Sequence, residues 1–155
     1  MCNIRLSRAK RKDVPAIANM AHTLVEHGLP LSWDERRVAH CLTNTDCIVI
    51  NAKDGRRLVG FAIMEFLDGR AHLYLLAVQP GHQGQGIGRV LLEWLHSSAR
   101  TAGIFLIDVE VRVSNLSAQS FYRSLGFCEA GVRRGYYGGK EDALRMSCNL
   151  SADVA

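Results

Sequence analysis

The spacing of hydrophobic residues at the start of the chain predicts a short strand followed by a helix. Ile4–Ala9 has the composition of a first strand. Apolar residues recur at helical intervals over residues 14–25, and Asp13 is the expected N-cap of that helix. Gly28 and Pro30 should end the helix, because neither residue favours its continuation.

The next segment predicts a shorter helix and then an antiparallel meander. Either Ser32 or Asp34 is expected to cap a helix that reaches Cys41–Leu42. Three strands follow, and each is joined to the next by an Asp-Gly pair, which favours a tight hairpin turn. The strands are Cys47–Asn51, Arg57–Phe66 and the strand ending at Leu73–Val78, and the turns are Asp54-Gly55 and Asp68-Gly69.

Beyond residue 86 the pattern changes from a meander to alternating helices and strands. A single apolar stripe predicts an amphipathic helix that starts near Gly86 and ends at Gly103. Because a strand, a helix and another strand follow in order, we expect a right-handed crossover and a parallel pair of strands. The later elements are a strand over Ile104–Val113, a helix over Asn115–Leu125, and a hairpin of Phe127–Val132 and Ala143–Leu150 with Arg133–Asp142 as its loop.

The composition is that of an ordinary globular protein. The 155 residues suit one domain over residues 1–155, and the hydrophobic content of 48% with 22% charged residues is typical of such domains. The longest apolar runs are far shorter than a membrane span, and the N-terminus lacks the apolar core of a signal peptide. We therefore expect a cytoplasmic protein, a monomer or homodimer, without membrane partners.

The spacing of the cysteines and the net charge of the chain limit the kinds of ligand that it is expected to bind. The five cysteines include no Cys-x-x-Cys pair and the six histidines show no metal-ligand spacing, so neither a disulfide framework nor a metal site is expected. A net charge of +4 suits an anionic ligand. It argues only weakly for nucleic acid, because no basic stripe interleaved with aromatic residues is present, and we expect no nucleic-acid partner.

Residues 83–88, Gln-Gly-Gln-Gly-Ile-Gly, lie where a predicted strand gives way to a helix. Three glycines in this segment leave backbone N–H groups uncovered by side chains. Those groups and the positive end of the helix dipole form a site for a phosphate or pyrophosphate. The alternative is that the glycines serve only tight packing, since such motifs alone have a high false-positive rate.

The strand at Ile104–Val113 has one apolar face and one face that becomes charged toward its carboxyl end. Alternate residues from Phe105 to Val113 are all apolar and are expected to be core. On the other face Asp108 and Glu110 suggest that this end opens on water or a ligand. Ligands of open α/β sheets bind outside the carboxyl ends of parallel strands, so the glycine loop and Glu110 should face one cleft.

Each of the candidate residues also has a purely structural interpretation. Glu110 could form an ion pair with Arg112 or Arg89. Asn115 could simply cap the helix that it opens, and Tyr122 could be a core aromatic residue with a satisfied hydroxyl. Their joint arrangement decides between these interpretations.

That arrangement resembles the GNAT superfamily of acyl-CoA-dependent N-acyltransferases, whose phosphate-binding signature is Q/R-x-x-G-x-G/A. Three segments of the second half also resemble the bacterial ribosomal-protein-alanine N-acetyltransferase subgroup. They are Glu110–Asn115, Ser120–Phe127, and Arg133–Tyr137 with the following Glu141–Ala143. The resemblance is close from about Leu73 to Leu150. It implies a mostly antiparallel sheet of six or seven strands, about four helices, and a central parallel pair splayed to hold acyl-CoA.

The resemblance also implies roles for particular residues and acetyl-CoA as cofactor. Glu110 matches the general base and Tyr122 the general acid. The residues expected to contact the cofactor are Leu76, Ala77 and Val78 along the pantetheine arm, Gln83, Gly84, Gln85, Gly86, Ile87, Gly88 and Arg89 at the diphosphate, and Asn115.

The chemistry of acyl transfer agrees with these roles. An amine must be neutral to attack a thioester, and an N-terminal α-amino group has a pKa of about 7.7–8.0, against about 10.4 for lysine. A carboxylate in the cleft can remove its proton, directly or through one water. A backbone N–H near Leu76 or Ala77 could stabilise the oxyanion, and the Tyr122 hydroxyl could protonate the departing thiolate. We expect direct transfer without an acyl-enzyme, since no cysteine falls on a matching catalytic position.

The first half, which should form part of the acceptor wall, departs from the subgroup pattern, with residues 27–33 replacing a shorter Pro-Trp segment. Tyr136 and Tyr137 could hold the first residues of a peptide or could equally pack the last hairpin. We expect transfer to the α-amino group of a protein N-terminus. The alternatives are a GNAT enzyme acting on a small amine such as a polyamine, amino acid or drug, and a non-catalytic acyl-CoA sensor, which would need neither Glu110 nor Tyr122.

Overall fold

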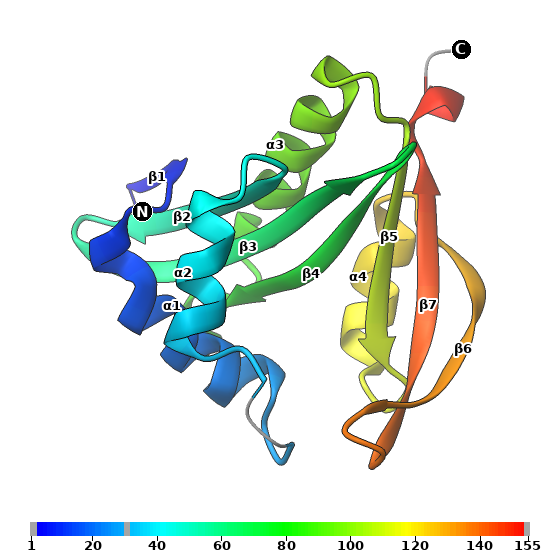
Figure 1. The fold of residues 1–155 in the computed structure, drawn as a ribbon, viewed down its shortest axis with the longest axis horizontal. Coiled ribbons are helices and arrows are strands. Elements are labelled where there is room, and N and C mark those ends of the chain that lie inside the picture. The colour runs from blue at the N-terminus through cyan, green and yellow to red at the C-terminus, as the bar shows by residue number, and fades with distance from the viewer. Residues whose placement is uncertain (1–2, 30–31, 154–155) are drawn as a thin grey trace. The chain divides into compact units, whose positions relative to one another are not determined.

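The computed structural model describes residues 3–29 and 32–153 (Figure 1). Its contacts divide the chain into two compact units. Unit 1 consists of Met1–Glu65 and Tyr74–Leu95, and unit 2 consists of Phe66–Leu73 and His96–Ala155. Strands β3 and β4 and helix α3 contribute to both units, with β3 over Arg57–Leu67, β4 over Arg70–Val78 and α3 over Ile87–Thr101.

Unit 1 contains the predicted meander. Strand β2 pairs in antiparallel register with β1 on one side and β3 on the other. Gly55 has a φ of +63°, which the tight turn between β2 and β3 requires. The strands are β1 over Ile4–Arg8, β2 over Cys47–Asp54 and β3 over Arg57–Leu67.

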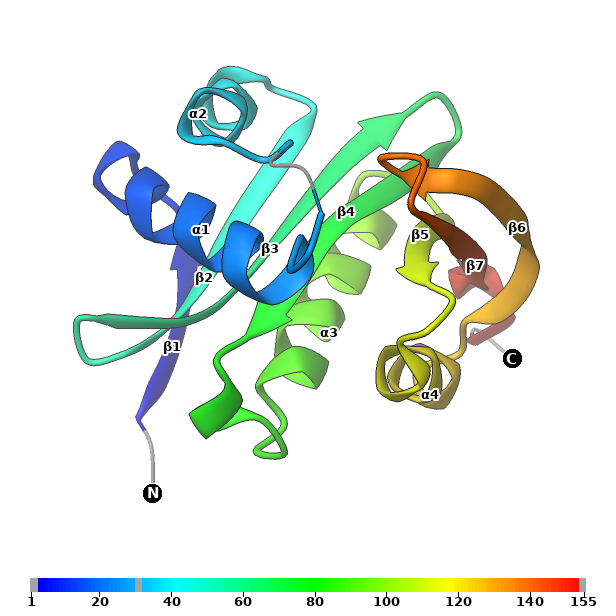
Figure 2. The ribbon, with the colours of Figure 1, turned by 90° about the horizontal axis from the view of Figure 1, so that it is seen from below.

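Helices cover both faces of the unit 1 strands, with α1 and α2 on one face and α3 on the other (Figure 2). Helix α1 spans Val14–Met20 and continues into a π-helical turn, Ala21–Val25, while α2 spans Glu35–Thr43. One face of the sheet closes a core with Ile17, Val38 and Phe61, each of which is fully buried. The helical period in the sequence therefore located both helices correctly.

The cap of the first helix was predicted wrongly. Asp13 precedes α1 but makes no side-chain cap there. Its carboxylate instead accepts a hydrogen bond from the Lys10 amide at 2.8 Å and pairs with Lys53 Nζ at 2.7 Å. The reason is that a 3₁₀ turn precedes α1 and places Asp13 at the end of that turn. The predicted stop at Pro30 lies outside the described residues.

The second helix is capped by Asp34 and not by Ser32. The Asp34 carboxylate accepts a hydrogen bond from the Arg37 amide at 2.9 Å. Ser32 instead donates its amide to the buried carboxylate of Glu26 at 2.9 Å, and the Trp33 amide donates to the same carboxylate at 3.0 Å. Glu26 thus anchors the chain that leads into α2.

Unit 2 contains the remaining strands and helix α4. Ala71, His72 and Leu73 of β4 pair in parallel with residues 107–109 of β5. Strand β7 then pairs in antiparallel register with β5 and β6. The elements are β5 over Leu106–Arg112, α4 over Leu116–Ser124, β6 over Cys128–Tyr137 and β7 over Glu141–Asn149.

The hydrogen-bonding order of the strands is β1-β2-β3-β4-β5-β7-β6. The prediction of a mixed α/β fold with a mostly antiparallel sheet of six or seven strands is confirmed, as are the parallel pair and the four α-helices of the described residues. None of the helices in residues 3–29 and 32–153 has the length and apolar character to cross a membrane.

Two boundaries in unit 2 differ from the prediction. Strand β5 is shorter than Ile104–Val113, and Phe105 and Val113 are exposed at 42% and 39%, so the predicted core face holds only at its centre. Strand β6 extends through the first half of the predicted loop to Tyr137. A register shift between Arg133 and Tyr137 accommodates Gly135 within the strand.

Candidate active site

The glycine-rich loop of unit 1 leads from the end of β4 into α3. Gly84 and Gly86 have φ angles of +79° and +82°, a region that side-chain-bearing residues rarely adopt. The Gly86 carbonyl accepts a hydrogen bond from the Val90 amide at 3.0 Å, which makes Gly86 the residue that opens the helix. The amides of the first turn, residues 87–89, have no partner within the helix.

The Gln83 side chain connects this loop to the end of β4. Gln83 Nε2 donates to the Val78 carbonyl at 3.1 Å, so its side chain holds the loop against the strand end. Residues 83–86 are exposed. Ile87 is buried, so only its amide is available to a ligand, while the side chain belongs to the core. Exposed glycine amides at a helix N-terminus fit a diphosphate in both shape and charge.

Unit 2 carries two carboxylates on one face of β5, and their environments differ. Asp108 and Glu110 are two residues apart on the strand and so lie on the same face. Across the sheet Asp108 lies opposite Ser147 and Glu110 lies opposite Arg145. Both carboxylates are buried, with exposures of 3% and 9%.

Asp108 is fully engaged in hydrogen bonds and ion pairs. Arg70 donates to it through Nε at 2.5 Å and through a terminal nitrogen at 2.8 Å, and Ser147 Oγ also donates to it. Burial alone would raise the pKa of Asp108, but these hydrogen bonds and the charges of Arg70 and Arg145 together hold it below its usual value. Asp108 is therefore a structural group.

Replacing Asp108 with Asn should lower the free energy of unfolding by about 2–3 kcal/mol. Breaking a fully buried ion pair typically costs about 3–5 kcal/mol, and the loss here should be smaller because Arg70 is partly exposed. Folding lowers the pKa of Asp108, so its ionised carboxylate stabilises the folded protein at pH values above the pKa of the unfolded chain. This stabilisation is lost as the pH falls through the pKa of Asp108 in the folded protein. Chemical denaturation at neutral and acidic pH measures both effects. The exposed pair of Glu129 with Arg123 provides the control, since Glu129→Gln should change stability by under about 0.5 kcal/mol.

Glu110 has no such set of partners. Neither carboxylate oxygen has a hydrogen-bond partner among the described residues, although the side chain is only 3% exposed. The charged group facing it is Arg133, whose Nε lies 3.6 Å from Oε1. Burial raises the pKa of Glu110 above its usual value, and the charges of Arg133 and Arg145 oppose that rise. A buried carboxylate with free lone pairs is suited to accept a proton.

The alternative ion pair between Glu110 and Arg112 is not present. Arg112 Nε instead donates to Glu141 at 2.8 Å. Tyr137 donates its hydroxyl to the Glu110 backbone carbonyl at 3.1 Å and so fixes the strand next to the carboxylate. Burial raises the pKa of Tyr137 well above its usual range, with smaller contributions from Tyr136 and Glu110.

Tyr122 lies on α4, which packs on the other face of the β5–β7 pair. The Cys148 thiol, opposite Ile107 in the sheet, donates to the Leu125 carbonyl at 3.8 Å. The Tyr122 ring meets Phe127 edge to face at 5.2 Å and is 6% exposed. Burial raises the pKa of Tyr122 well above its usual value, which keeps the hydroxyl protonated. Glu110 and Tyr122 therefore lie on opposite sides of the β5–β7 pair of unit 2.

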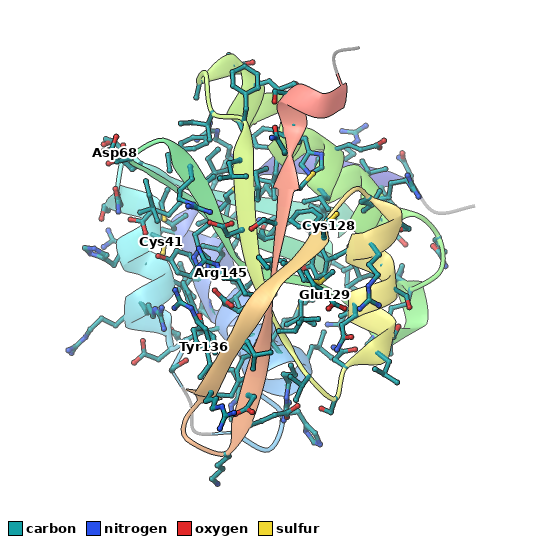
Figure 3. The ribbon with its side chains drawn as sticks, turned by 90° about the vertical axis from the view of Figure 1, so that its right-hand side faces the viewer. Cys41, Asp68, Cys128, Glu129, Tyr136 and Arg145 are labelled. Atoms are coloured by element: carbon teal, nitrogen blue, oxygen red, sulfur yellow. The ribbon has the colours of Figure 1, made fainter. Side chains whose placement is uncertain are left out.

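The other predicted residues of unit 2 have clear local roles. Asn115 caps α4, with its side-chain oxygen accepting from the Ala118 amide at 3.0 Å, and its amide group is left as a donor. Tyr136 is 39% exposed and meets Tyr137 edge to face at 5.0 Å. Figure 3 shows Tyr136 near the hairpin loop, at the other end of β6 from Cys128 and Glu129.

Sequence reasoning missed two arginines beside Glu110. Arg145 lies opposite Glu110 on β7, and Arg133 reaches it from β6. The strand alternation of residues 143–149 could have placed Arg145 on the charged face. Arg133 could not have been placed, because its segment was expected to be a loop.

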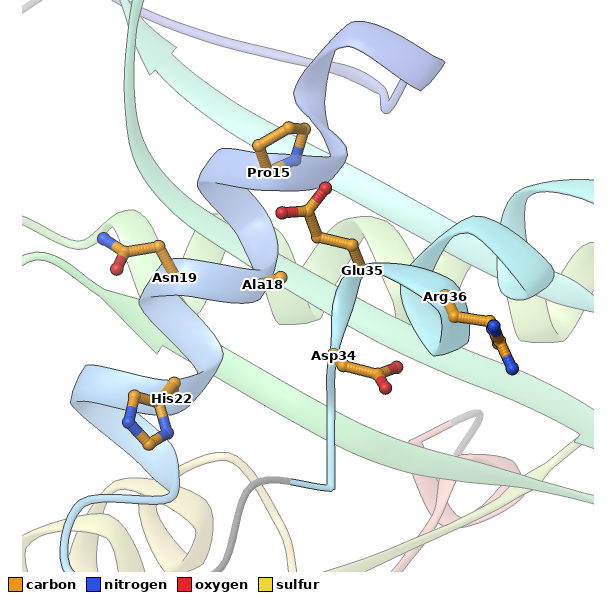
Figure 4. A pocket seen from close by; sticks show the side chains of 7 residues that line it. All are labelled: Pro15, Ala18, Asn19, His22, Asp34, Glu35 and Arg36. Atoms are coloured by element: carbon orange, nitrogen blue, oxygen red, sulfur yellow. The ribbon is translucent and has the colours of Figure 1, made fainter.

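A separate surface hollow of about 550 Å³ lies in unit 1 (Figure 4). It contains none of the predicted site residues, and its walls come from α1, the π-helical turn and the start of α2. Its lining residues are Pro15, Ala18, Asn19, His22, Asp34, Glu35 and Arg36. Among the described residues, no group of three or more His, Cys, Asp or Glu side chains could hold a metal ion.

Known proteins share the sequence and the fold of this chain. The sequence pattern of the Acetyltransferase (GNAT) family matches residues 16–127. The ribosomal protein bS18-alanine N-acetyltransferase of Escherichia coli K12 is 34% identical over 151 residues, which cover 94% of this chain and 97% of that protein. The crystal structure of the E. coli enzyme matches with a TM-score of 0.82 at 33% identity, covering 95% and 94% of the two chains.

A more distant structure shows the same fold. The paia N-acetyltransferase of Thermoplasma acidophilum, in complex with coenzyme A, matches with a TM-score of 0.78 at 18% identity, covering 95% of this chain and 99% of that one. The chain therefore belongs to the GNAT family of acetyltransferases. Its cofactor is acetyl-CoA, the acetyl donor of that family.

Proposed function

We propose that this acetyltransferase modifies the N-terminal α-amino group of a protein, with Glu110 as the general base and Tyr122 as the general acid. The observation that carries the proposal is the Glu110 carboxylate, which is buried and has both oxygens free of hydrogen bonds among the described residues. A pure acyl-CoA sensor would have no need of such a group. The similarity to an alanine N-acetyltransferase over nearly the whole chain favours an α-amino acceptor.

The cofactor would be held by main-chain groups. The amides of residues 83–89 would bind the diphosphate and the strand Leu76–Val78 would lie along the pantetheine arm. The side-chain amide of Asn115 would add a donor. Acetyl-CoA supplies an activated acetyl group as a thioester. An amide near Leu76 or Ala77 would stabilise the oxyanion that forms on attack.

The side chains of unit 2 would move the protons. The Glu110 carboxylate accepts the proton of the attacking amine, directly or through one water, and the modest pKa of an α-amino group makes this transfer easy near neutrality. Tyr122 holds its proton because burial raises its pKa, and gives it to the departing sulfur. The nitrogen attacks the thioester carbon directly and the sulfur leaves as the thiol, so transfer proceeds without an acyl-enzyme. Tyr136 is exposed and would contact the acceptor's first residues.

Replacing Tyr122 with Phe should lower kcat by about 10- to 100-fold, toward the lower end of general acid–base effects because water can partly replace the proton donor. The ring packing against Phe127 would be kept, so stability should change little. Steady-state kinetics and thermal unfolding test both statements. A normal kcat for Tyr122→Phe would assign the proton donor to water.

The identity of the acceptor is tested by incubating the enzyme and acetyl-CoA with a panel of amines and detecting the acetylated products by mass spectrometry. The panel contains peptides that begin with Ala or other residues, N-blocked peptides with one lysine, and spermidine. We expect acetylation of the α-amino group in the unblocked peptides. Preferred acetylation of spermidine, or of lysine in the blocked peptides, would contradict the proposal.

A further inference from the structure

Two arginines flank Glu110, and the structure holds them very differently. Arg145 lies directly opposite Glu110 on β7, and a terminal nitrogen lies 3.4 Å from the Asp108 carboxylate, which is itself fixed by Arg70. Arg133, on β6, has a side chain that is 50% exposed. Its Nε lies 3.6 Å from Glu110 Oε1, which is close enough for an ion pair but too long for a hydrogen bond.

The positions around Arg133 leave it room to move. Along the sheet, Arg145 lies opposite Gly131 and Arg133 lies opposite Ala143, so the neighbouring positions on β6 and β7 carry small side chains. The Arg133 guanidinium also lies 5.9 Å from the centre of the exposed Tyr136 ring, a second place where a cation is stabilised. Glu110 therefore has one fixed and one movable counter-ion.

An acceptor amine approaching Glu110 carries a positive charge at neutral pH and comes to the carboxylate that Arg133 already faces. Two cations at one carboxylate repel each other. We infer that the acceptor's amino group displaces Arg133 from Glu110, and that Arg133 then selects for amines that carry a carbonyl next to the amine-bearing carbon. This inference rests on the proposed function of Glu110 as the base.

The selection follows from what the displaced guanidinium can bind. In a peptide N-terminus the first carbonyl oxygen lies only a few bonds from the amino nitrogen, so an arginine displaced over a short distance can donate to it. A polyamine presents donors and no acceptor oxygen near its nitrogen, so the displaced Arg133 loses the Glu110 carboxylate and gains nothing. Arg145 remains in place and keeps Glu110 ionised in both cases.

The test compares Arg133→Gln with Arg134→Gln, which removes the same charge at the next residue of β6, an exposed arginine. An Ala-initiated peptide and spermidine are the two acceptors. For Arg133→Gln we expect KM for the peptide to rise about tenfold or more, as for the loss of a hydrogen bond from a charged group. KM for spermidine should stay equal or fall, and KM for acetyl-CoA should not change.

Arg134→Gln should leave all three values unchanged, and Arg133→Lys should recover part of the preference for the peptide. An equal change for both acceptors in Arg133→Gln, or the same effect in Arg134→Gln, would overturn the inference. If the wild-type enzyme prefers the peptide and Arg133→Gln keeps that preference, only this inference fails. If the wild-type enzyme acetylates spermidine and not the peptide, the proposed function fails and the inference with it.

Discussion

Replacing Glu110 with Gln should reduce kcat/KM for an N-terminal peptide by about 100-fold or more at neutral pH, in the range found for general base catalysis. The amide keeps the size of the side chain but does not accept a proton in this range. The remaining reaction needs an amine that is already neutral, so its rate should increase with pH through the pKa of the acceptor. Acetyl-CoA binding should be nearly unchanged, because main-chain amides of the glycine loop, and not the Glu110 side chain, would hold the cofactor.

In the wild-type enzyme the loss of activity at acidic pH should reflect protonation of Glu110. The pKa of Glu110 is raised by burial, so activity should fall as the pH drops through a value above the usual carboxyl pKa. Asp108, Arg133 and Arg145 also face the group and set the pH at which activity falls. Glu129→Gln, at an exposed carboxyl of β6, is the control and should leave the profile unchanged. Identical profiles for Glu110→Gln and the wild-type enzyme would remove Glu110 as the base.

Replacing Gly86 with Val should weaken acetyl-CoA binding by more than about 100-fold. Gly86 has a φ of +82°, and a β-branched residue at such an angle is strongly disfavoured, so the loop must change its backbone to accept the side chain. The added side chain also stands where a diphosphate would approach the amides. Isothermal titration calorimetry with coenzyme A and with acetyl-CoA measures the loss.

Gly55→Val separates backbone strain from lost binding. Gly55 has a φ of +63° in the turn between β2 and β3, and an added Cβ would meet nothing within 4 Å, as at Gly86. Both variants should therefore lose similar stability in thermal unfolding, of about 1–2 kcal/mol. Only Gly86→Val should lose the ligand. If folded Gly86→Val binds acetyl-CoA with the affinity of the wild-type enzyme, the diphosphate does not bind at this loop.

The sequence was most informative where a local pattern controls the structure. Positive φ at Gly55, Gly84 and Gly86 follows from local turn chemistry, and the residue types at those positions already indicated it. The stripe of α3 and the central residues of β5 follow from helical and strand periods. Glu110 was a visible candidate because a charged residue interrupts a buried strand.

Features that depend on pairing between distant strands were not visible. Arg133 lies next to Glu110 only because β6 extends past the expected loop boundary and a register shift accommodates Gly135. The bidentate bond of Arg70 to Asp108 joins residues that are far apart in the sequence. Asp13 was assigned as a helix cap because its residue type suits one, but a preceding 3₁₀ turn and Lys53 use its carboxylate instead.

The central claim is that Glu110 takes the proton of an α-amino group while main-chain amides of the glycine loop hold the cofactor. A crystal structure with a covalent conjugate of coenzyme A and an Ala-initiated peptide tests both parts together. We predict the peptide's amino nitrogen about 2.6–3.2 Å from the Glu110 carboxylate or from one water bound to it. The diphosphate should lie on the amides of residues 83–89. A nitrogen remote from Glu110, or a diphosphate away from that loop, would contradict the account.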